Sequence, residues 1–390
     1  MKTIVAGLFC FLCLSGTSWA QPYHPLAENE VLEILPIRLE SRREIQVLRQ
    51  RTLENPNDAP AALKLVKRYI ELGRAESDPR YYGYAEAALA PWLRANQTSA
   101  EALTLSATLH QSRHEFPAAL ADLQQALRLQ PRLAQAWLTR AVIFEVQGDY
   151  PAALKSCLPL AKLAPPLTTA TCINSALSLS GQAESAYDRL ASALQALPES
   201  NATDRQWTLT TLAEIAARLG RFEAADRDFK SALALNPRSS YLLATYADFL
   251  LDQRRCQEVH TLLKEEVRAD NLLLRLALAE QCLKAPELAV HADALKDRFA
   301  ASRLRGDTAH QGDEARFVLH VLNDNQTALN LAQANWLVQH EPRDARILLE
   351  AALAAGNPKA GQVVLDTLAG TGLEDIQLKS LAERLRGTSS

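Results

Sequence analysis

The segment Trp137–Pro165, WLTRAVIFEVQGDYPAALKSCLPLAKLAP, carries the spacing on which the rest of the chain is built. Trp137, Ala141 and Phe144 recur at helical intervals, and Gly148 then interrupts the run. Helical spacing resumes after the glycine and ends at a proline, a residue that cannot continue a helix. The segment therefore predicts two helices joined by a tight turn.

The same spacing recurs before and after this segment. Units end at residues that stand about 34 positions apart, with one longer interval that contains the polar insertion ESNATD. These end residues are Pro131, Pro165, Pro198, Pro237 and Asn271. Small residues stand at fixed distances before them: Ala119, Ala153, Ala186 and Ala225 in the second helix, and Gly148, Gly181 and Gly220 at the turn. A register held over so many units predicts a repeat array, because a generic helical bundle would not keep it.

The positions of tryptophan, glycine, tyrosine, alanine and proline in each unit resemble those of the tetratricopeptide repeat, a helix–turn–helix unit. The resemblance covers roughly nine units, from about residue 57 to 370, and is most specific between residues 100 and 271. It implies an all-α fold, a right-handed superhelical solenoid of antiparallel helix pairs with a concave inner face.

We expect five regions along the chain. Residues 1–20 indicate a cleaved signal peptide, 21–56 a leader with an N-terminal capping helix, 57–271 regular repeats, 272–372 degenerate repeats, and 373–390 a C-terminal capping helix and tail. The insertion RAESDPR, residues 74–80, is expected to displace the second helix of the first repeat. The stretch RGDTAHQGDEA, residues 305–315, is expected to form a long link within one continuous solenoid.

The first twenty residues, MKTIVAGLFCFLCLSGTSWA, have the order of a secretory signal. Lys2 precedes an apolar run from Ile4 to Leu14, which is too short to cross a bilayer, and a small-x-small triplet ends at Ala20. We therefore expect an exported, periplasmic protein of Gram-negative bacterial type. No later run reaches membrane-spanning length, so we expect no membrane insertion after removal of the signal.

Charge and motifs argue against several classes of function. The formal net charge is −3, with acidic and basic residues mixed throughout, which argues against nucleic acid as the partner. No phosphate-binding glycine loop, nucleophile elbow or zinc-protease motif is present. His110 and His114 are four residues apart but occupy structural positions of a repeat. We therefore expect no enzyme activity, no catalytic or cofactor-binding residues and no metal site.

Four of the six cysteines remain after the signal, because Cys10 and Cys13 lie within it. The four are Cys157, Cys172, Cys256 and Cys282. Each sequential pair is centred on the turn between one repeat's second helix and the next repeat's first, so its members lie at the same height on antiparallel helices. We therefore predict two disulfides, Cys157–Cys172 and Cys256–Cys282. Four buried free thiols remain the alternative.

The inner face of the solenoid is the candidate functional site. The inward-facing positions of the first helices hold Thr104, Thr108, Thr139, Thr171, Ser175, Thr210, Thr211, Glu214, Thr245 and Asp248. Similar repeats that clamp a C-terminal carboxylate use lysine at these positions, and none is present here. A hydroxyl-rich, mildly acidic surface suits a peptide backbone or basic side chains. Alternatively, the threonines bond to the preceding carbonyls of their own helices.

These observations favour a non-enzymatic scaffold or adaptor of the cell envelope that binds a protein or peptide in the concave groove. An accessory factor that delivers a metal or cofactor to an envelope enzyme is the alternative. The class of function rests on resemblance of fold, and a fold does not name its partner.

Overall fold

The computed structural model describes residues 39–94, 99–307 and 309–388. Within these ranges the regular elements are all helices, as the sequence predicts. The expected signal peptide and most of the leader lie outside the described residues. Residues from Val47 onward form one compact unit, and the following paragraphs concern that unit.

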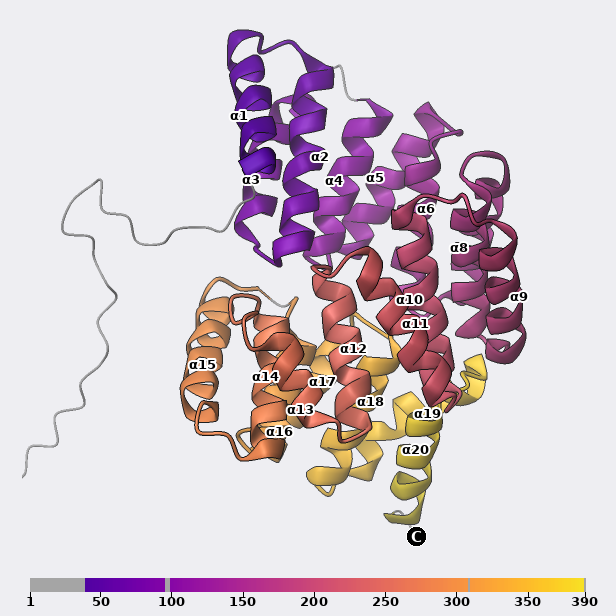
Figure 1. The fold of residues 1–390 in the computed structure, drawn as a ribbon, viewed down its shortest axis with the longest axis vertical. Coiled ribbons are helices and arrows are strands. Elements are labelled where there is room, and N and C mark those ends of the chain that lie inside the picture. Colours follow the sequence, from indigo (N-terminus) through magenta and orange to yellow (C-terminus); the bar gives the residue numbers. More distant parts are fainter. Residues whose placement is uncertain (1–38, 95–98, 308, 389–390) are drawn as a thin grey trace, which may run out of the picture. The chain divides into compact units, whose positions relative to one another are not determined.

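The described residues of this unit form nine antiparallel helix pairs in succession (Figure 1). The first helices are α2 (Ala59–Glu76), α4 (Ala100–Ser112), α6 (Ala134–Val146), α8 (Pro166–Ser178), α10 (Ala202–Arg218), α12 (Ser240–Asp252), α14 (Asp270–Leu283), α16 (Gln311–His320) and α18 (Pro342–Ala354). Each first helix packs on the next along the series. The predicted all-α solenoid of helix pairs is confirmed.

The second helices are α3 (Arg80–Arg94), α5 (Phe116–Leu129), α7 (Tyr150–Cys157) with the 3₁₀ helix η1 (Leu158–Lys162), α9 (Ala183–Ala196), α11 (Phe222–Leu235), α13 (Cys256–Leu263), α15 (Leu288–Leu304), α17 (Asn325–Trp336), and η2 (Pro358–Gly361) with α19 (Gln362–Thr371). Helix α1 (Leu39–Glu54) precedes the pairs, and α20 (Ile376–Thr388) follows them and packs on α18. None of the described helices is long and apolar enough to cross a membrane.

Local chemistry sets the helix boundaries. The side chain of Asp58 accepts a hydrogen bond from the N–H of Ala61 and so caps α2, which then begins with Ala59–Pro60. The turns between paired helices need a left-handed residue. Gly148, Gly181 and Gly220 supply it with φ of 75°, 77° and 76°.

Three details differ from the sequence prediction. The expected insertion at residues 74–80 is partly helical, because α2 continues to Glu76 before Ser77 ends it in the left-handed region. The polar stretch ESNATD is not a loop throughout, since Asn201 caps α10 and its last residues form the first turn of that helix. The expected long link at 305–315 is shorter, because α16 begins at Gln311. In each case polar residues form a helix terminus that the apolar spacing cannot show.

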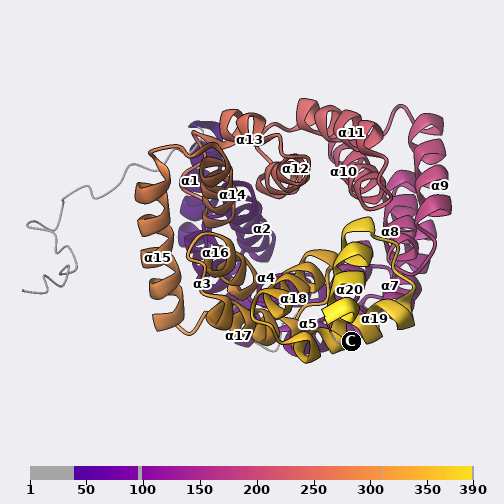
Figure 2. The same cartoon turned by 90° about the horizontal axis from the view of Figure 1, so that it is seen from below.

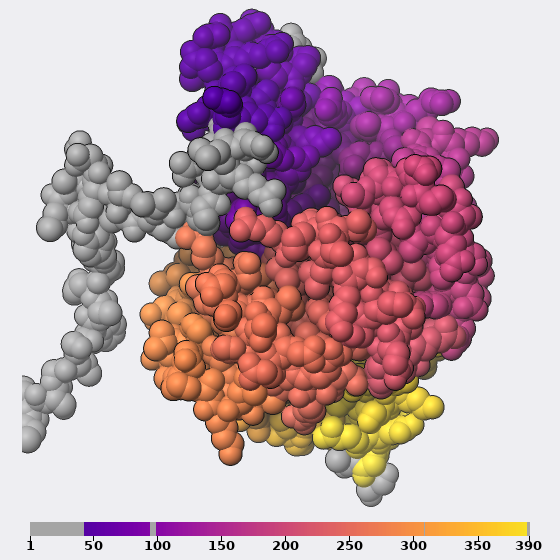
Figure 3. Space-filling model, viewed as in Figure 1, coloured from indigo at the N-terminus to yellow at the C-terminus, as the bar shows by residue number. Residues whose placement is uncertain are grey.

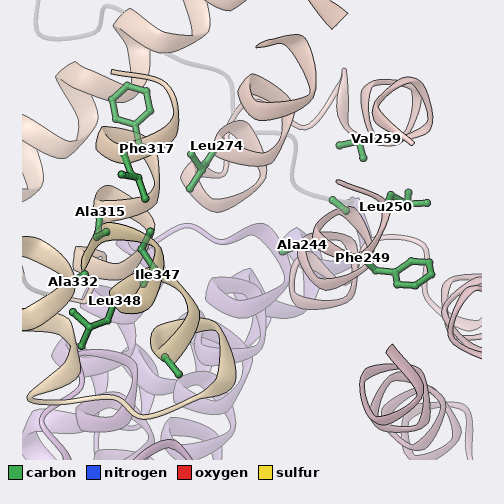
Figure 4. Close-up of a cluster of buried hydrophobic side chains, with 14 of the residues drawn as sticks. Ala244, Phe249, Leu250, Val259, Leu274, Ala315, Phe317, Ala332, Ile347 and Leu348 are labelled. Atoms are coloured by element: carbon green, nitrogen blue, oxygen red, sulfur yellow. The ribbon is translucent and has the colours of Figure 1, made fainter. Parts of the chain in front are cut away.

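The core of the C-terminal half is continuous across repeats. Figure 4 shows part of it, with side chains from α12, α14, α16, α17 and α18. Phe229 packs on Phe249, with ring centroids 5.6 Å apart, and Phe299 packs on Phe317 at 5.7 Å. Alanine at the close approaches, such as Ala225, is completely buried, as the small-residue register predicts. Figure 3 shows α10 to α16, coloured pink to orange, as one continuous surface.

The C-terminal repeats also meet the middle repeats end-on. The backbone N–H of His340, just before α18, donates to Val146 O at 2.7 Å, and its Nδ1 bonds Gln147 O at 2.8 Å. The carboxylate of Glu374, just before α20, accepts from the N–H of Ala183 at 2.6 Å. We call these bonds the closing contacts. Figure 2 shows α19 and α20, in yellow, beside α7 and α8.

The turn glycines also serve the closing contacts. A methyl group on Gly148 would lie 3.2 Å from the Cβ of His340, and one on Gly220 would lie 3.2 Å from a methyl of Ile376. A methyl group on Gly181 would lie 3.3 Å from Gly372 O. The C-terminal segment therefore contacts equivalent turns of three consecutive repeats. It can approach these turns closely because each has a glycine, which carries no side chain.

Candidate functional site

Most of the predicted groove hydroxyls are buried and bonded within their own helices. Thr104, Thr108, Thr139, Thr171, Thr210 and Thr211 are each less than a tenth exposed. The hydroxyls of Thr104, Thr108, Thr171, Thr210 and Thr245 donate to the carbonyl four residues earlier. The alternative left open by the sequence therefore describes these five threonines, whose hydroxyls bond carbonyls of their own helices.

Thr171 shows how completely such a side chain is used. It is 0% exposed, it donates to Leu167 O at 2.9 Å, and its hydroxyl lies 2.7 Å from that of Thr208 on the next first helix. The hydroxyl thus links α8 to α10 and has no surface left for a ligand.

Two other predicted groove residues, Ser175 and Glu214, each bond a residue of a neighbouring first helix on α6 to α12. Ser175 donates to Glu145 at 3.2 Å, and the Tyr241 hydroxyl donates to Glu214 at 2.5 Å. We call Glu145, Ser175, Glu214 and Tyr241 the inner acidic surface. Tyr241 is 52% exposed, so this surface remains accessible to solvent.

The two carboxyl groups of this surface have perturbed acidity. Burial raises the pKa of Glu145 to about 8; the hydrogen bond from Ser175 opposes this shift, while Glu341 and Glu214 add to it. Burial also raises the pKa of Glu214, against the hydrogen bond from Tyr241. In the described part of the chain, neither glutamate forms an ion pair with a basic side chain. The surface therefore holds acidic groups that a cation would stabilise.

The segment after His340 lies close to this surface. Arg343 is 57% exposed at its side chain and bonds Glu341 at 2.6 Å. Its positive charge acts to lower the pKa of Glu214, whereas the charge of Glu341 acts to raise it. The charges of Glu341 and Arg343, at the start of α18, therefore act on Glu214 in opposite directions.

Asp248, the remaining predicted groove residue, is neutralised by the chain itself. It pairs with Arg275 at 2.8 Å and with Arg316 at 2.5 Å, and Arg275 also pairs with Asp313 at 3.1 Å. Although burial alone would raise the pKa of Asp248, the two arginines lower it to about 2.

A second group of ion pairs lies further along the same helices. Arg346 of α18 pairs with Asp252 at 2.7 Å and with Glu350 at 2.8 Å, and His320 lies 2.9 Å from Glu350. Charged side chains thus link α12, α14, α16 and α18 along the inner side of the last four repeats. Glu145 and Glu214 form no such ion pair among the described residues, although the charge of Arg218 acts to lower the pKa of both.

Sequence reasoning missed Glu145 and Arg343. Glu145 stands one residue after the aromatic Phe144 of the repeat, at a position that spacing alone places near the end of the first helix. Arg343 follows Pro342 in a repeat of weak register. Its proximity to α10 and α12 depends on contact between distant repeats, and periodicity within a repeat carries no signal for it.

The four cysteines form two disulfides in the structure. Cys157 and Cys172 have Cα atoms 5.7 Å apart, and Cys256 and Cys282 have Cα atoms 6.3 Å apart. The first pair is buried, whereas Cys282 is exposed at the end of α14. Each bond joins a second helix to the following first helix and so ties neighbouring repeats together.

The histidine pair of the second repeat is used structurally. His110 Nδ1 bonds Glu115 at 2.5 Å, and the ring of His114 stacks on Phe116 with centroids 5.5 Å apart. His114 itself takes the left-handed turn position with φ of 58°. Among the described residues no group of three or more histidine, cysteine or acidic side chains suits a metal ion.

Comparison with known proteins gives structural similarity alone. No family model matches the chain, and no curated protein matches it. The chain is similar to Cut9–Hcn1 of the APC/C (13% identity, 88% of this chain, 52% of the other, TM-score 0.44). It is also similar to yeast Tom70, with 11% identity over 90% of this chain and 86% of the other and a TM-score of 0.43. A third similar structure is a tetratricopeptide repeat protein from Parabacteroides merdae, with 16% identity over 65% of this chain and 98% of the other and a TM-score of 0.38. The chain thus matches about half the length of the first. These similarities concern helical architecture and assign no function.

Proposed function

We propose that the protein is a non-enzymatic scaffold or adaptor of the cell envelope that binds a partner protein through its inner acidic surface. The observation that carries the proposal is that Glu145 and Glu214, which form no ion pair among the described residues, lie beside the half-exposed Tyr241. Carboxylates in partly buried surroundings favour a guanidinium or ammonium group from a partner. The proposed partner therefore presents a segment with arginine or lysine.

Further support comes from how the helix pairs hold this surface. Its four residues lie on α6, α8, α10 and α12, whose contacts with one another are fixed by buried alanines and threonines. A preformed surface of this kind needs little ordering when a partner binds. Export to the periplasm is part of the proposal and rests on the first twenty residues of the sequence.

The test is affinity capture with the full chain from the envelope fraction of its own host. Wild type is compared with Glu145→Gln/Glu214→Gln, which removes both carboxyl groups while keeping size and shape. Glu101→Gln/Glu223→Gln is the matched control, since these glutamates are exposed in the first turns of α4 and α11. We expect one protein to be retained by wild type and the control but lost by the first variant.

Equal capture by all three proteins would overturn the inner acidic surface as the binding site. Groove variants such as Thr171→Arg are unsuitable, because a completely buried threonine cannot accept arginine without disturbing the packing of α8 on α10. Fractionation of the host with sequencing of the mature N-terminus tests export, for which we expect a periplasmic protein that starts at Gln21.

A further inference from the structure

The two disulfides differ in how far solvent reaches their cysteines. In the first bond Cys157 is 0% exposed and Cys172 is 2% exposed, and both belong to one apolar cluster. In the second bond Cys256 is 3% exposed, whereas Cys282 is exposed. A thiolate must reach a disulfide sulfur in order to exchange with it. Access therefore favours exchange at Cys282 over exchange at the Cys157–Cys172 bond.

The second disulfide is flanked by positive charge. Cys256 directly follows the turn between α12 and α13, and Cys282 is the penultimate residue of α14. Arg254 and Lys284 each stand two residues from one of these cysteines, and both are exposed. Within the described residues neither of the two forms an ion pair. Cations of this kind attract an incoming thiolate, which is an anion.

The buried sulfur lies where a departing thiolate is stabilised. Cys256 is the first residue of α13, and among the described residues no side chain caps this helix end. The backbone N–H groups of the first turn favour a thiolate and oppose the effect of burial. Glu258 in the same turn is neutralised by Arg255 at 2.6 Å. Cys282, by contrast, lies at the C-terminal end of α14, where the carbonyls disfavour a negative charge.

We propose that Cys256–Cys282 is a thiol-exchange site, at which a protein dithiol of the Cys-X-X-Cys type reversibly reduces this bond and leaves Cys157–Cys172 intact. This proposal goes beyond partner binding and does not depend on the inner acidic surface.

The reaction has two steps. One thiolate of the dithiol attacks Sγ of Cys282, so that a mixed disulfide forms and the electron pair of the broken bond goes to Sγ of Cys256. The second thiolate of the dithiol then attacks the sulfur of its own protein in the mixed disulfide and releases Cys282. The dithiol is oxidised to a disulfide, and its two protons end on the two cysteines.

Reduction changes one junction between repeats. Helix α13 has eight residues and packs on α12 and α14, and the disulfide ties it covalently to α14. Without this bond α13 is held by noncovalent contacts alone, whereas α7 and α8 stay tied by theirs. The redox state of the dithiol therefore sets the local stability of a single repeat junction.

The first test compares the two bonds in the folded full chain. The oxidised protein is treated with dithiothreitol, samples are quenched with iodoacetamide, and mass mapping follows the alkylation of each cysteine. We expect Cys256 and Cys282 to be alkylated at least tenfold sooner than Cys157 and Cys172. In urea that unfolds the chain, the two bonds should be reduced at similar rates. Equal rates in the folded protein would overturn the proposal, because both bonds would then react only through unfolding.

The second test identifies the sulfur that is attacked. Reduced glutathione is a monothiol, so a pulse of iodoacetamide traps the product of the first step with glutathione on one cysteine and an alkyl group on the other. We expect glutathione on Cys282 and the alkyl group on Cys256, in at least tenfold excess over the reverse product. Glutathione found mainly on Cys256 would contradict attack at Cys282.

The third test uses a protein dithiol. Thioredoxin whose second active-site cysteine is replaced by serine cannot complete the second step and should remain joined to Cys282. Wild type and Cys157→Ala/Cys172→Ala should form this adduct, whereas Cys256→Ala/Cys282→Ala should not. Selective reduction by dithiothreitol without any thioredoxin adduct would overturn a protein dithiol as the reductant. If either variant does not fold, mapping of the adduct on wild type still decides between the two disulfides.

Discussion

Replacing Arg275 by methionine tests whether the inner ion pairs stabilise the last four repeats. The Arg275 side chain is 3% exposed and bonds Asp248, Asp313 and the carbonyl of Asn271. Methionine keeps much of the volume and removes the charge. Asp248 retains Arg316, but Asp313 loses the one ion pair recorded for it within the described residues.

The expected loss follows from burial. Removing one partner of a fully buried ion pair costs about 3–5 kcal/mol of unfolding free energy. Asp248 and Asp313 are about a quarter exposed, so solvent screens the carboxylates that remain. We therefore expect a loss of about 2–3 kcal/mol at pH 7. Arg298→Met is the control, because Arg298 is 37% exposed and its pair with Asp270 should contribute less than about 1 kcal/mol.

The loss of unfolding free energy in Arg275→Met should become smaller in acid. The pKa of Asp248 is lowered to about 2 from an ordinary value of 3.8, so its ionised form is favoured in the folded state. Its contribution to stability is complete above pH 4 and is lost as the pH falls through 2. The difference between wild type and Arg275→Met should therefore shrink between pH 5 and pH 2.

Urea unfolding followed by circular dichroism at several pH values measures this difference, provided that the slope with denaturant stays the same. The double variant Arg275→Met/Asp313→Asn should recover part of the loss, because it removes the uncompensated carboxylate. A loss at pH 7 no larger than that of Arg298→Met, or one that does not shrink in acid, would refute the reasoning.

Three further predictions follow from the geometry. Cys157→Ala/Cys172→Ala should lower stability by about 3 kcal/mol, because the bond closes a loop with a sequence separation of 15; an unchanged melting temperature against oxidised wild type would contradict this. Glu145→Gln should gain stability relative to wild type as pH rises from 5 to 9, because a pKa raised to about 8 makes ionisation of Glu145 unfavourable in the folded state; parallel pH–stability curves would argue against it. Phe229→Ala should cost about 3–5 kcal/mol, since this ring is 1% exposed between Tyr246 and Phe249; urea midpoints test this, and a loss below about 1 kcal/mol would show that the site collapses.

The turns, helix caps and close helix contacts could be predicted from the sequence, because the residues that determine each of them lie within one or two repeats. A glycine at the turn needs a positive φ, an aspartate before Ala-Pro caps a helix, and small residues mark the close approach of two helices. Gly148, Asp58 and Ala225 show these three cases in the structure. The sequence predicted the wrong ends for helices with polar terminal residues, such as the end of α2 at Glu76 and the start of α16 at Gln311. The spacing of apolar residues says little about where such a helix ends.

The candidate site was only partly predictable, for two physical reasons. Threonines in a first helix satisfy the inward-facing pattern whether they face a ligand or bond their own carbonyls, and Thr171 shows the second use. The influence of Arg343 on the pKa of Glu214 depends on small rotations summed over several repeats. The sequence spacing predicts which neighbouring helices pack together. It does not predict the total rotation over several repeats.

The closing contacts also bear on how such a chain can change over time. An ordinary solenoid can gain or lose a unit by duplication or deletion, since each unit touches only its neighbours. Here His340 must arrive at the end of α6 and Glu374 at the start of α9. Adding or removing one unit between them would rotate and shift the later repeats and separate these partners. The number of repeats between α6 and α18 is therefore a property that the fold itself constrains.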